Sequence, residues 1–252
     1  MQMKNRKKWK INRTSHLFLT LVLVFIFTGL TSNAFGFFGF GNTASWKEEV
    51  LLHDGSKIVV ERWQKRGGRH ELGQRLGIAE HSITFRLPRT KQVVKWKDEY
   101  SVDVGSSSLE LLALDIINGT AYIVSKPVGM IAYNKWDRPN PPYVIFKFTG
   151  EDWKRINMPE LPSEFRDVNL VIDTLDHEED LVRQGVISAE RVKEFNSSLT
   201  QEEYKTIIHK PLKPGSPGIS EPVMIRIKDG WESPDGGRAP IPIIPYGTKE
   251  KK

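Results

Sequence analysis

The segment LELLALDIINGTAYIVS, residues 109–125, decides the fold. Two runs rich in aliphatic and β-branched residues, 109–117 and 120–125, flank the dipeptide Asn118-Gly119. Asn-Gly tolerates the positive φ angles of a two-residue hairpin turn and is the strongest short-range hairpin signal. A connection this short joins only antiparallel neighbours, because parallel strands need a long crossover. The segment therefore predicts an antiparallel β-hairpin.

The same strand-turn-strand pattern continues in both directions along the chain. Upstream, Asp54-Gly55 separates two apolar runs, and the run 82–87 places Ile83, Phe85 and Leu87 on one face. Such alternation is typical of a half-buried strand. The other predicted strands are 50–53, 57–63, 91–97, 129–135, 143–148, 153–156 and 223–228, with a shorter one at 170–172.

These short strands and short turns predict an all-β fold of antiparallel hairpins. We favour a sandwich over a partial propeller. The aromatic hairpins at 146–153 and 225–231 resemble propeller blades, but a propeller needs a repeat of about 40 residues. The tryptophans after residue 34 follow no fixed period, since they stand at positions 46, 63, 96, 136, 153 and 231.

Helix signals are confined to a small insertion near 188–209. Ser188 is a suitable N-cap for a helix over 189–195, and Thr200 with Glu203 forms a capping box that predicts a helix to about His209. We therefore expect a β-rich domain at 45–172. The region 173–252 is expected to hold an acidic segment, these short helices, a last strand and a proline-rich tail.

The positive charge of the chain is concentrated at its N-terminus. The formal net charge is +6; six basic residues lie within residues 4–13, and no acid precedes Glu48. An apolar run, 17–30, and the small-x-small sequence 32–34 follow these basic residues. The three features together are typical of a secretory signal peptide over 1–34, so the protein is predicted to be periplasmic or secreted. Residues 35–44 read as a Phe/Gly-rich linker.

The alternative is an uncleaved anchor in the inner membrane. The apolar run 17–30 is shorter than the roughly 20 residues of a spanning helix, but the sequence FGFFGF at 35–40 lengthens it. In that case residues 17–40 would tether the protein to the membrane.

Composition argues against several functions. Without residues 1–34 the chain has 31 basic and 31 acidic residues, so it lacks the net positive charge expected of a nucleic-acid binder. It has no cysteine, which excludes disulfides, thiol catalysis and Cys-ligated metals. The common serine-hydrolase, zinc-protease and phosphate-loop motifs are missing as well. We expect no cofactor.

Two groups of residues could suggest a metal site but have simpler interpretations. The acidic run 173–180 offers carboxylates to a divalent cation, yet an acidic first helical turn explains it better. We therefore expect no metal site. The histidines after residue 34 show no metal-pair spacing, and a surface or turn role is favoured for each; they are His53, His70, His81, His177 and His209.

The most binding-like patch is a proline-rich loop bracketed by aromatic residues. Exposed aromatic faces beside Asn and Asp can stack on sugar rings or on prolines of a peptide. A packed structural corner is the alternative and the favoured interpretation. The candidate binding residues are Tyr133, Trp136, Asp137, Asn140 and Tyr143.

Several of these motifs resemble a family of uncharacterised proteobacterial exported proteins. The resemblance covers roughly 45–172 and rests on WKEEV at 46–50, YNKW at 133–136, RPNPPY at 138–143 and the Trp153-x-x-Ile156 hairpin. It implies an envelope location but no activity. Members of that family often carry a lipid-anchored cysteine, which this chain lacks.

We therefore expect an exported envelope protein that acts as a non-catalytic binding or accessory domain, with an envelope protein or a glycan as partner. One alternative is a hydrolase acting on envelope polymers through scattered carboxylates and histidines. The other is a membrane-tethered structural accessory.

Overall fold

The computed structural model describes residues 42–68 and 76–240. The described residues belong to one unit of the chain. The predicted signal peptide and most of the predicted linker lie outside the described residues, as do His70 and the tether 17–40.

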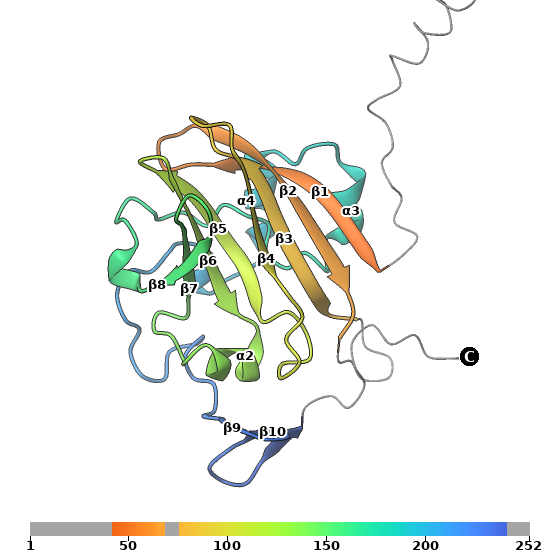
Figure 1. Ribbon diagram of the computed structural model, residues 1–252, viewed down its shortest axis with the longest axis vertical. Helices are drawn as coiled ribbons and strands as arrows, with labels where there is room; N and C mark the ends of the chain where they lie inside the picture. Colours follow the sequence, from red (N-terminus) through yellow and green to blue (C-terminus); the bar gives the residue numbers. More distant parts are fainter. Residues whose placement is uncertain (1–41, 69–75, 241–252) are drawn as a thin grey trace, which may run out of the picture. The chain divides into compact units, whose positions relative to one another are not determined.

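The described residues form eleven strands in three antiparallel sheets, with three α-helices (Figure 1). This confirms the predicted all-β fold with a small helical insertion. The first sheet contains, in order, β1 (Thr43–Leu51), β2 (Lys57–Arg66), β3 (Ile78–Arg86) and β4 (Val93–Asp98). The second contains β5 (Leu109–Ile117), β6 (Thr120–Pro127), β7 (Val144–Phe148) and β8 (Trp153–Ile156). A small third sheet contains β9 (Ile225–Ile227), β10 (Gly230–Glu232) and β11 (Arg238–Pro240).

The hairpin predicted around Asn118-Gly119 is present. Asn118 and Gly119 have φ angles of 52° and 80°, and Ile117 pairs directly with Thr120. Both central residues therefore adopt the positive φ angles that a type I′ turn requires.

The first two sheets form a sandwich that shares one hydrophobic core. Ile83, Phe85 and Trp96 from the first sheet pack in the same buried cluster as Leu111 and Ile123 from the second. Strand alternation points these side chains to one face of each sheet. At one seam of the sandwich the indole N–H of Trp153 donates to the carbonyl of Lys95 at 2.9 Å, which joins β8 to β4.

The opposite seam is closed by a segment without regular secondary structure, 168–175. The Asn169 side-chain amide donates to the carbonyls of Leu51 and Leu114 at 2.9 Å each, and its oxygen accepts from the Leu114 amide at 3.0 Å. Asn169 thus connects β1 with β5. The stretch predicted as a strand, 170–172, is not one, although the Leu170 amide bonds to the carbonyl of Leu112.

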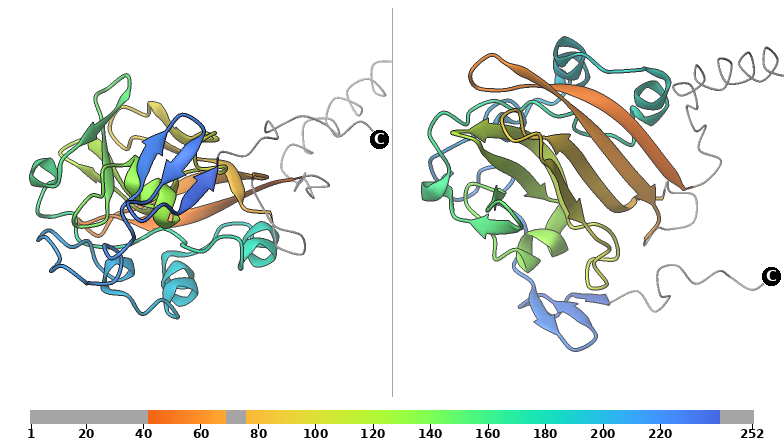
Figure 2. Two further views of the ribbon diagram at one scale, coloured as in Figure 1. Left: turned by 90° about the horizontal axis from the view of Figure 1, so that it is seen from below. Right: turned by 45° about the horizontal axis from the view of Figure 1, so that its top comes forward.

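Helices lie along one side of the sandwich (Figure 2). The helix α4 (Ala189–Asn196) begins as predicted, because the Ser188 side chain accepts from the Arg191 amide. The helix α3 (Glu178–Arg183) has three acids in its first turn, which matches the interpretation of the acidic run. Trp46 of β1 packs with Leu181 and Phe195 of these helices.

Two further predicted elements are wrong. Residues 129–135 form the helix α2 (Gly129–Lys135) and not a strand; Ala132 and Tyr133 are its buried residues. The helix predicted to reach His209 is only a short 3-10 turn, Glu202–Tyr204. Beyond it, the Ile207 amide donates to the carbonyl of Arg166, so tertiary pairing replaces the next helical turn.

In the part of the chain that the structure describes, no helix is long and apolar enough to cross a membrane.

Candidate functional site

The predicted binding loop starts at the end of α2, where two aromatic side chains pack inward. Tyr133 is 4% exposed, its hydroxyl donates to the carbonyl of Pro139, and Arg138 stacks on its ring. Trp136 is half-buried against the shared core, and its indole N–H donates to the Ser108 hydroxyl at 3.1 Å. These contacts are those of a packed corner.

The polar members of the loop are held by neighbouring segments. Asp137 is exposed and pairs with Arg155 at 3.2 Å. Asn140 exchanges two hydrogen bonds with the backbone of Leu212, at 2.7 and 3.0 Å. Tyr143 is buried, and its hydroxyl donates toward the carbonyls of Glu203 and Thr206. Burial raises the pKa of the Tyr143 hydroxyl well above its ordinary value, so it stays a donor.

The five predicted residues thus lie in one loop but face different partners. None of them lines the cavity described next. Their role in binding stays a prediction.

A cavity of about 320 Å³ lies at one end of the sandwich. Both sheets and the segment 171–175 line it, and we call it the inter-sheet cavity. Its polar lining residues are Arg62, Gln64, His81, Ser106, Ser107, Glu110, Asp173 and Thr174. Its apolar lining residues are Ile78, Leu109, Leu111, Val128, Val171 and Leu175. The volume falls within the range of small-molecule sites.

A buried ion pair forms one wall of this cavity. Arg62 of β2 is 4% exposed and donates from one terminal nitrogen to Glu48 Oε1 at 2.8 Å. Glu48 is fully buried and also accepts from the Trp46 indole N–H at 3.0 Å. The Arg62 guanidinium carries five N–H groups, and within residues 42–68 and 76–240 this is its one hydrogen bond. The other N–H groups are buried donors beside a cavity.

Gln64 fixes the neighbouring part of the wall. Its side-chain oxygen accepts from the Thr174 hydroxyl at 2.7 Å, and its amide donates to Glu178 at 2.7 Å. Arg66 holds the same Glu178 carboxylate with two further bonds. Charge-assisted bonds of this kind restrict side-chain motion, so this wall is preorganised.

His81 brings an imidazole ring to the cavity. It is 5% exposed, and its Nε2 lies 2.8 Å from the carbonyl oxygen of Leu109. Because a carbonyl oxygen only accepts, Nε2 carries a hydrogen, and the Asp98 carboxylate lies 3.8 Å from the same nitrogen. No hydrogen bond from Nδ1 to a described residue is present, and Trp96 packs edge-on against the ring at 5.5 Å.

Glu110 brings a carboxyl group to the same cavity. Burial raises its pKa, and the nearby charge of Asp173 acts in the same direction. The Asp173 amide donates to Glu110 Oε1 at 3.3 Å, which partly offsets both effects. Asp173 has a φ angle of 53°, an uncommon conformation for a residue other than glycine. A perturbed carboxyl beside backbone strain is typical of functional sites.

The chemistry of the cavity is therefore mixed. It offers guanidinium N–H donors, an imidazole ring and a carboxyl group, separated by aliphatic side chains. This suits a small ligand that carries both an oxygen acceptor and a hydroxyl or amino donor. No group of three metal-ligating side chains occurs in the described parts of the chain.

Sequence reasoning missed these residues, although a signal was present. Glu48 alternates with Trp46 and Val50, and His81 alternates with Ile83 and Phe85. A charged or polar side chain on the apolar face of a strand indicates a buried polar group, which needs a partner. By the same criterion Arg62 is expected to be buried, unlike an ordinary surface arginine.

Comparisons with protein-family models, curated proteins and solved structures gave no match. The resemblance to proteobacterial exported proteins stays a prediction.

Proposed function

We propose that the protein is an exported envelope domain that binds a small polar ligand in the inter-sheet cavity, without chemical conversion. The observation that carries the proposal is the buried Arg62 guanidinium, which holds one hydrogen bond and lines a cavity of ligand size. A buried donor without a partner costs about 1–3 kcal/mol. A ligand oxygen in the cavity recovers that free energy.

The arrangement of the walls also favours binding. The Gln64, Thr174 and Glu178 bonds fix one side of the cavity before any ligand arrives, and a preorganised site loses less entropy on binding. The set of polar groups in the cavity suits a sugar unit or an amino acid, since both present acceptors and donors within a few bonds.

The test is a ligand-observed NMR screen of the full chain with single sugars, amino acids and dicarboxylates. We expect ligands whose affinity falls at least tenfold in Glu110→Gln, a variant that keeps the shape of the side chain but removes its acid. A paired variant, Glu48→Gln with Arg62→Gln, removes the buried charges together and should also lose the hits. Arg89→Gln, at an exposed turn, is the matched control. Hits that survive both cavity variants would disprove this site.

One specific observation supports the hydrolase alternative. Glu110 with its raised pKa and Asp173 both line the cavity, and paired carboxyl groups in different environments are the usual catalytic groups of glycoside hydrolysis. In that case Glu110→Gln should bind an oligosaccharide without cleaving it. Release of reducing ends by the wild type, lost in Glu110→Gln, would establish this alternative over simple binding.

The tethered-accessory alternative depends on residues 17–40, which lie outside the described residues.

A further inference from the structure

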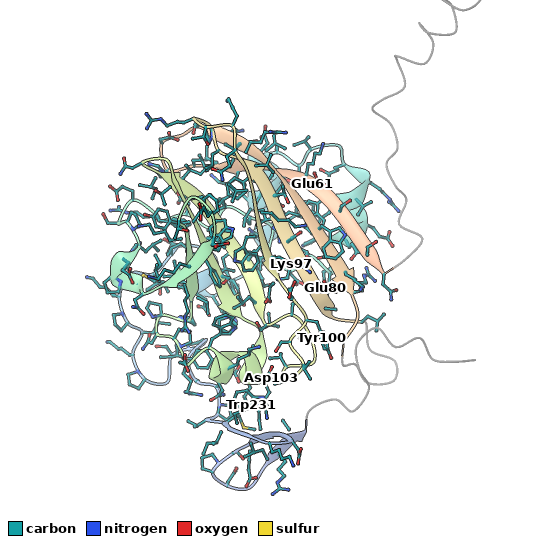
Figure 3. All side chains as sticks on the ribbon, in the orientation of Figure 1. Glu61, Glu80, Lys97, Tyr100, Asp103 and Trp231 are labelled. Carbon is teal, nitrogen blue, oxygen red and sulfur yellow. The ribbon has the colours of Figure 1, made fainter. Side chains whose placement is uncertain are left out.

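Part of the outer face of the first sheet is open to solvent. Alternation points Arg62, Gln64 and the core residues inward, so the intervening residues of β1–β4 face outward. Val59 and Val93 on this face are 50% and 52% exposed. Figure 3 shows Glu61, Glu80 and Lys97 on this sheet. By contrast, residues that follow β8 cover the outer face of the second sheet.

This outer face is positively charged, although the chain after residue 34 is neutral. It carries six cations against three carboxylates. The cations are Lys47, Lys57, Lys65, Arg86, Lys95 and Lys97, and the acids are Glu49, Glu61 and Glu80.

Ion pairs leave part of this charge uncompensated. Lys57 pairs with Glu49, and Lys97 pairs with Glu80 at 2.9 Å. Lys47 and Lys95 form no ion pair with any residue of the described ranges. They lie at the two ends of one row across the sheet, Lys47–Glu61–Thr84–Lys95. Three inter-strand spacings separate them, about 14 Å.

Trp63 lies in the next row, opposite Ser45 on β1 and Ser82 on β3. It is partly exposed and belongs to none of the hydrophobic clusters of the described residues. Ser82, directly opposite, also points outward and is 2% exposed. Part of the Trp63 side chain is open to solvent on this face.

We propose that this face binds a strand of acidic polysaccharide. Sugar rings stack on the flat indole of Trp63, and the carboxylates of the polymer pair with Lys47 and Lys95. A partly exposed aromatic side chain and separated cations on one face of a sheet suit an extended ligand better than a compact one. The face is separate from the inter-sheet cavity, since Trp63, Lys47 and Lys95 do not line that cavity.

The test is affinity gel electrophoresis of the full chain in detergent micelles, with polygalacturonate as the acidic polysaccharide. We expect retardation that weakens at least tenfold in Trp63→Ala and in the double variant Lys47→Gln with Lys95→Gln. Trp63→Phe keeps an aromatic ring and should restore part of the binding. Lys154→Gln, an exposed cation on β8, and the cavity variant Glu110→Gln should bind as the wild type does.

Three other polymers distinguish the contribution of ring stacking to binding from the contribution of charge. Neutral pullulan, poly-L-glutamate and double-stranded DNA should each bind at least tenfold more weakly than polygalacturonate. Equal binding of poly-L-glutamate or DNA would overturn the proposal, because charge alone would then explain it. Equal binding of pullulan would overturn the role of the lysines.

Unchanged retardation of Trp63→Ala, or no retardation of the wild type, would overturn the proposal too. The thermal unfolding of each variant is measured alongside its binding. The double lysine variant changes only exposed side chains, so it tests the surface even if Trp63→Ala fails to fold.

Discussion

His53 and Asp115 connect the first hairpin turn to the second sheet. The His53 ring nitrogen Nδ1 lies 2.8 Å from the carboxylate of Asp115, which also accepts the His53 backbone amide at 3.1 Å. Asp115 is 4% exposed. The hydrogen bond to Asp115 raises the pKa of His53 above 6.5, and the charges of Asp54 and Glu164 act in the same direction.

This contact makes stability depend on pH in a defined direction. A raised pKa means that the folded protein binds the proton more tightly than the unfolded chain does. The stabilisation is therefore complete below pH 6.5 and is lost as the pH rises through the pKa of folded His53. His53→Gln keeps a hydrogen-bonding side chain but does not titrate.

We expect urea unfolding to show the largest stability difference between wild type and His53→Gln near pH 5.5, and a smaller one near pH 8.5. A difference that grows with pH would contradict the assignment. His209→Gln, which removes another histidine, is the control.

Trp136 distinguishes a packed corner from a recognition loop. Its indole packs against the shared core and bonds to Ser108, so Trp136→Ala should lower the free energy of unfolding by about 3 kcal/mol. The same substitution at Trp63, which belongs to none of the hydrophobic clusters of the described residues, should cost less. Urea denaturation measures both. If Trp136→Ala kept wild-type stability but abolished capture of an envelope partner, the loop would be a binding site.

The buried polar residues and their partners could be predicted only in part from the sequence. Alternation shows that Glu48 and His81 share a face with core residues. It does not show that Arg62 pairs with Glu48, because that contact depends on the register between β1 and β2. His53 and Asp115 are 62 residues apart in the sequence. No local sequence pattern indicates a contact between residues so far apart along the chain.

At the scale of elements, Asn169 is the residue that closes one seam of the sandwich. Asn169→Asp removes both amide donors and places a carboxylate against the carbonyls of Leu51 and Leu114. We expect a loss of about 3 kcal/mol or more, because a buried charge then faces unpaired acceptors. Chemical denaturation at neutral pH measures it.

The matched control is Asn118→Asp in the hairpin turn, where Asp also tolerates a positive φ angle. Its cost should be a few tenths of a kcal/mol, as usual for an exposed substitution. Equal losses in the two variants would show that Asn169 does not bridge the sheets.

Hairpins were predictable because their signals are local. Asn118-Gly119 and its flanking strands appear at the predicted positions. The strand predicted at 129–135 was wrong because a short apolar run does not distinguish strand from helix. The capping box at Thr200 failed for a different reason: tertiary contacts at Ile207 outweigh a short helix, whose propagation adds little free energy.

At the scale of the whole molecule, export is the prediction with the simplest test. The basic N-terminus and apolar run predict that a reporter enzyme fused after Lys252, of a kind active only outside the cytoplasm, will be active. The same fusion without residues 1–34 should be inactive. Equal activity of the two fusions, or activity of a reporter restricted to the cytoplasm, would contradict the predicted location.

The edge of β1 stays open until late in synthesis. Its cover is Ile187, whose amide donates to the carbonyl of Lys47 at 2.9 Å and whose carbonyl accepts the Glu49 amide at 2.8 Å. Every strand of the sandwich has been synthesised some thirty residues earlier, by Ile156. An uncovered edge strand pairs readily with another chain. A nascent chain that pauses between these points is therefore prone to aggregate, and a chain truncated after residue 172 should form oligomers in size-exclusion chromatography while the full chain does not.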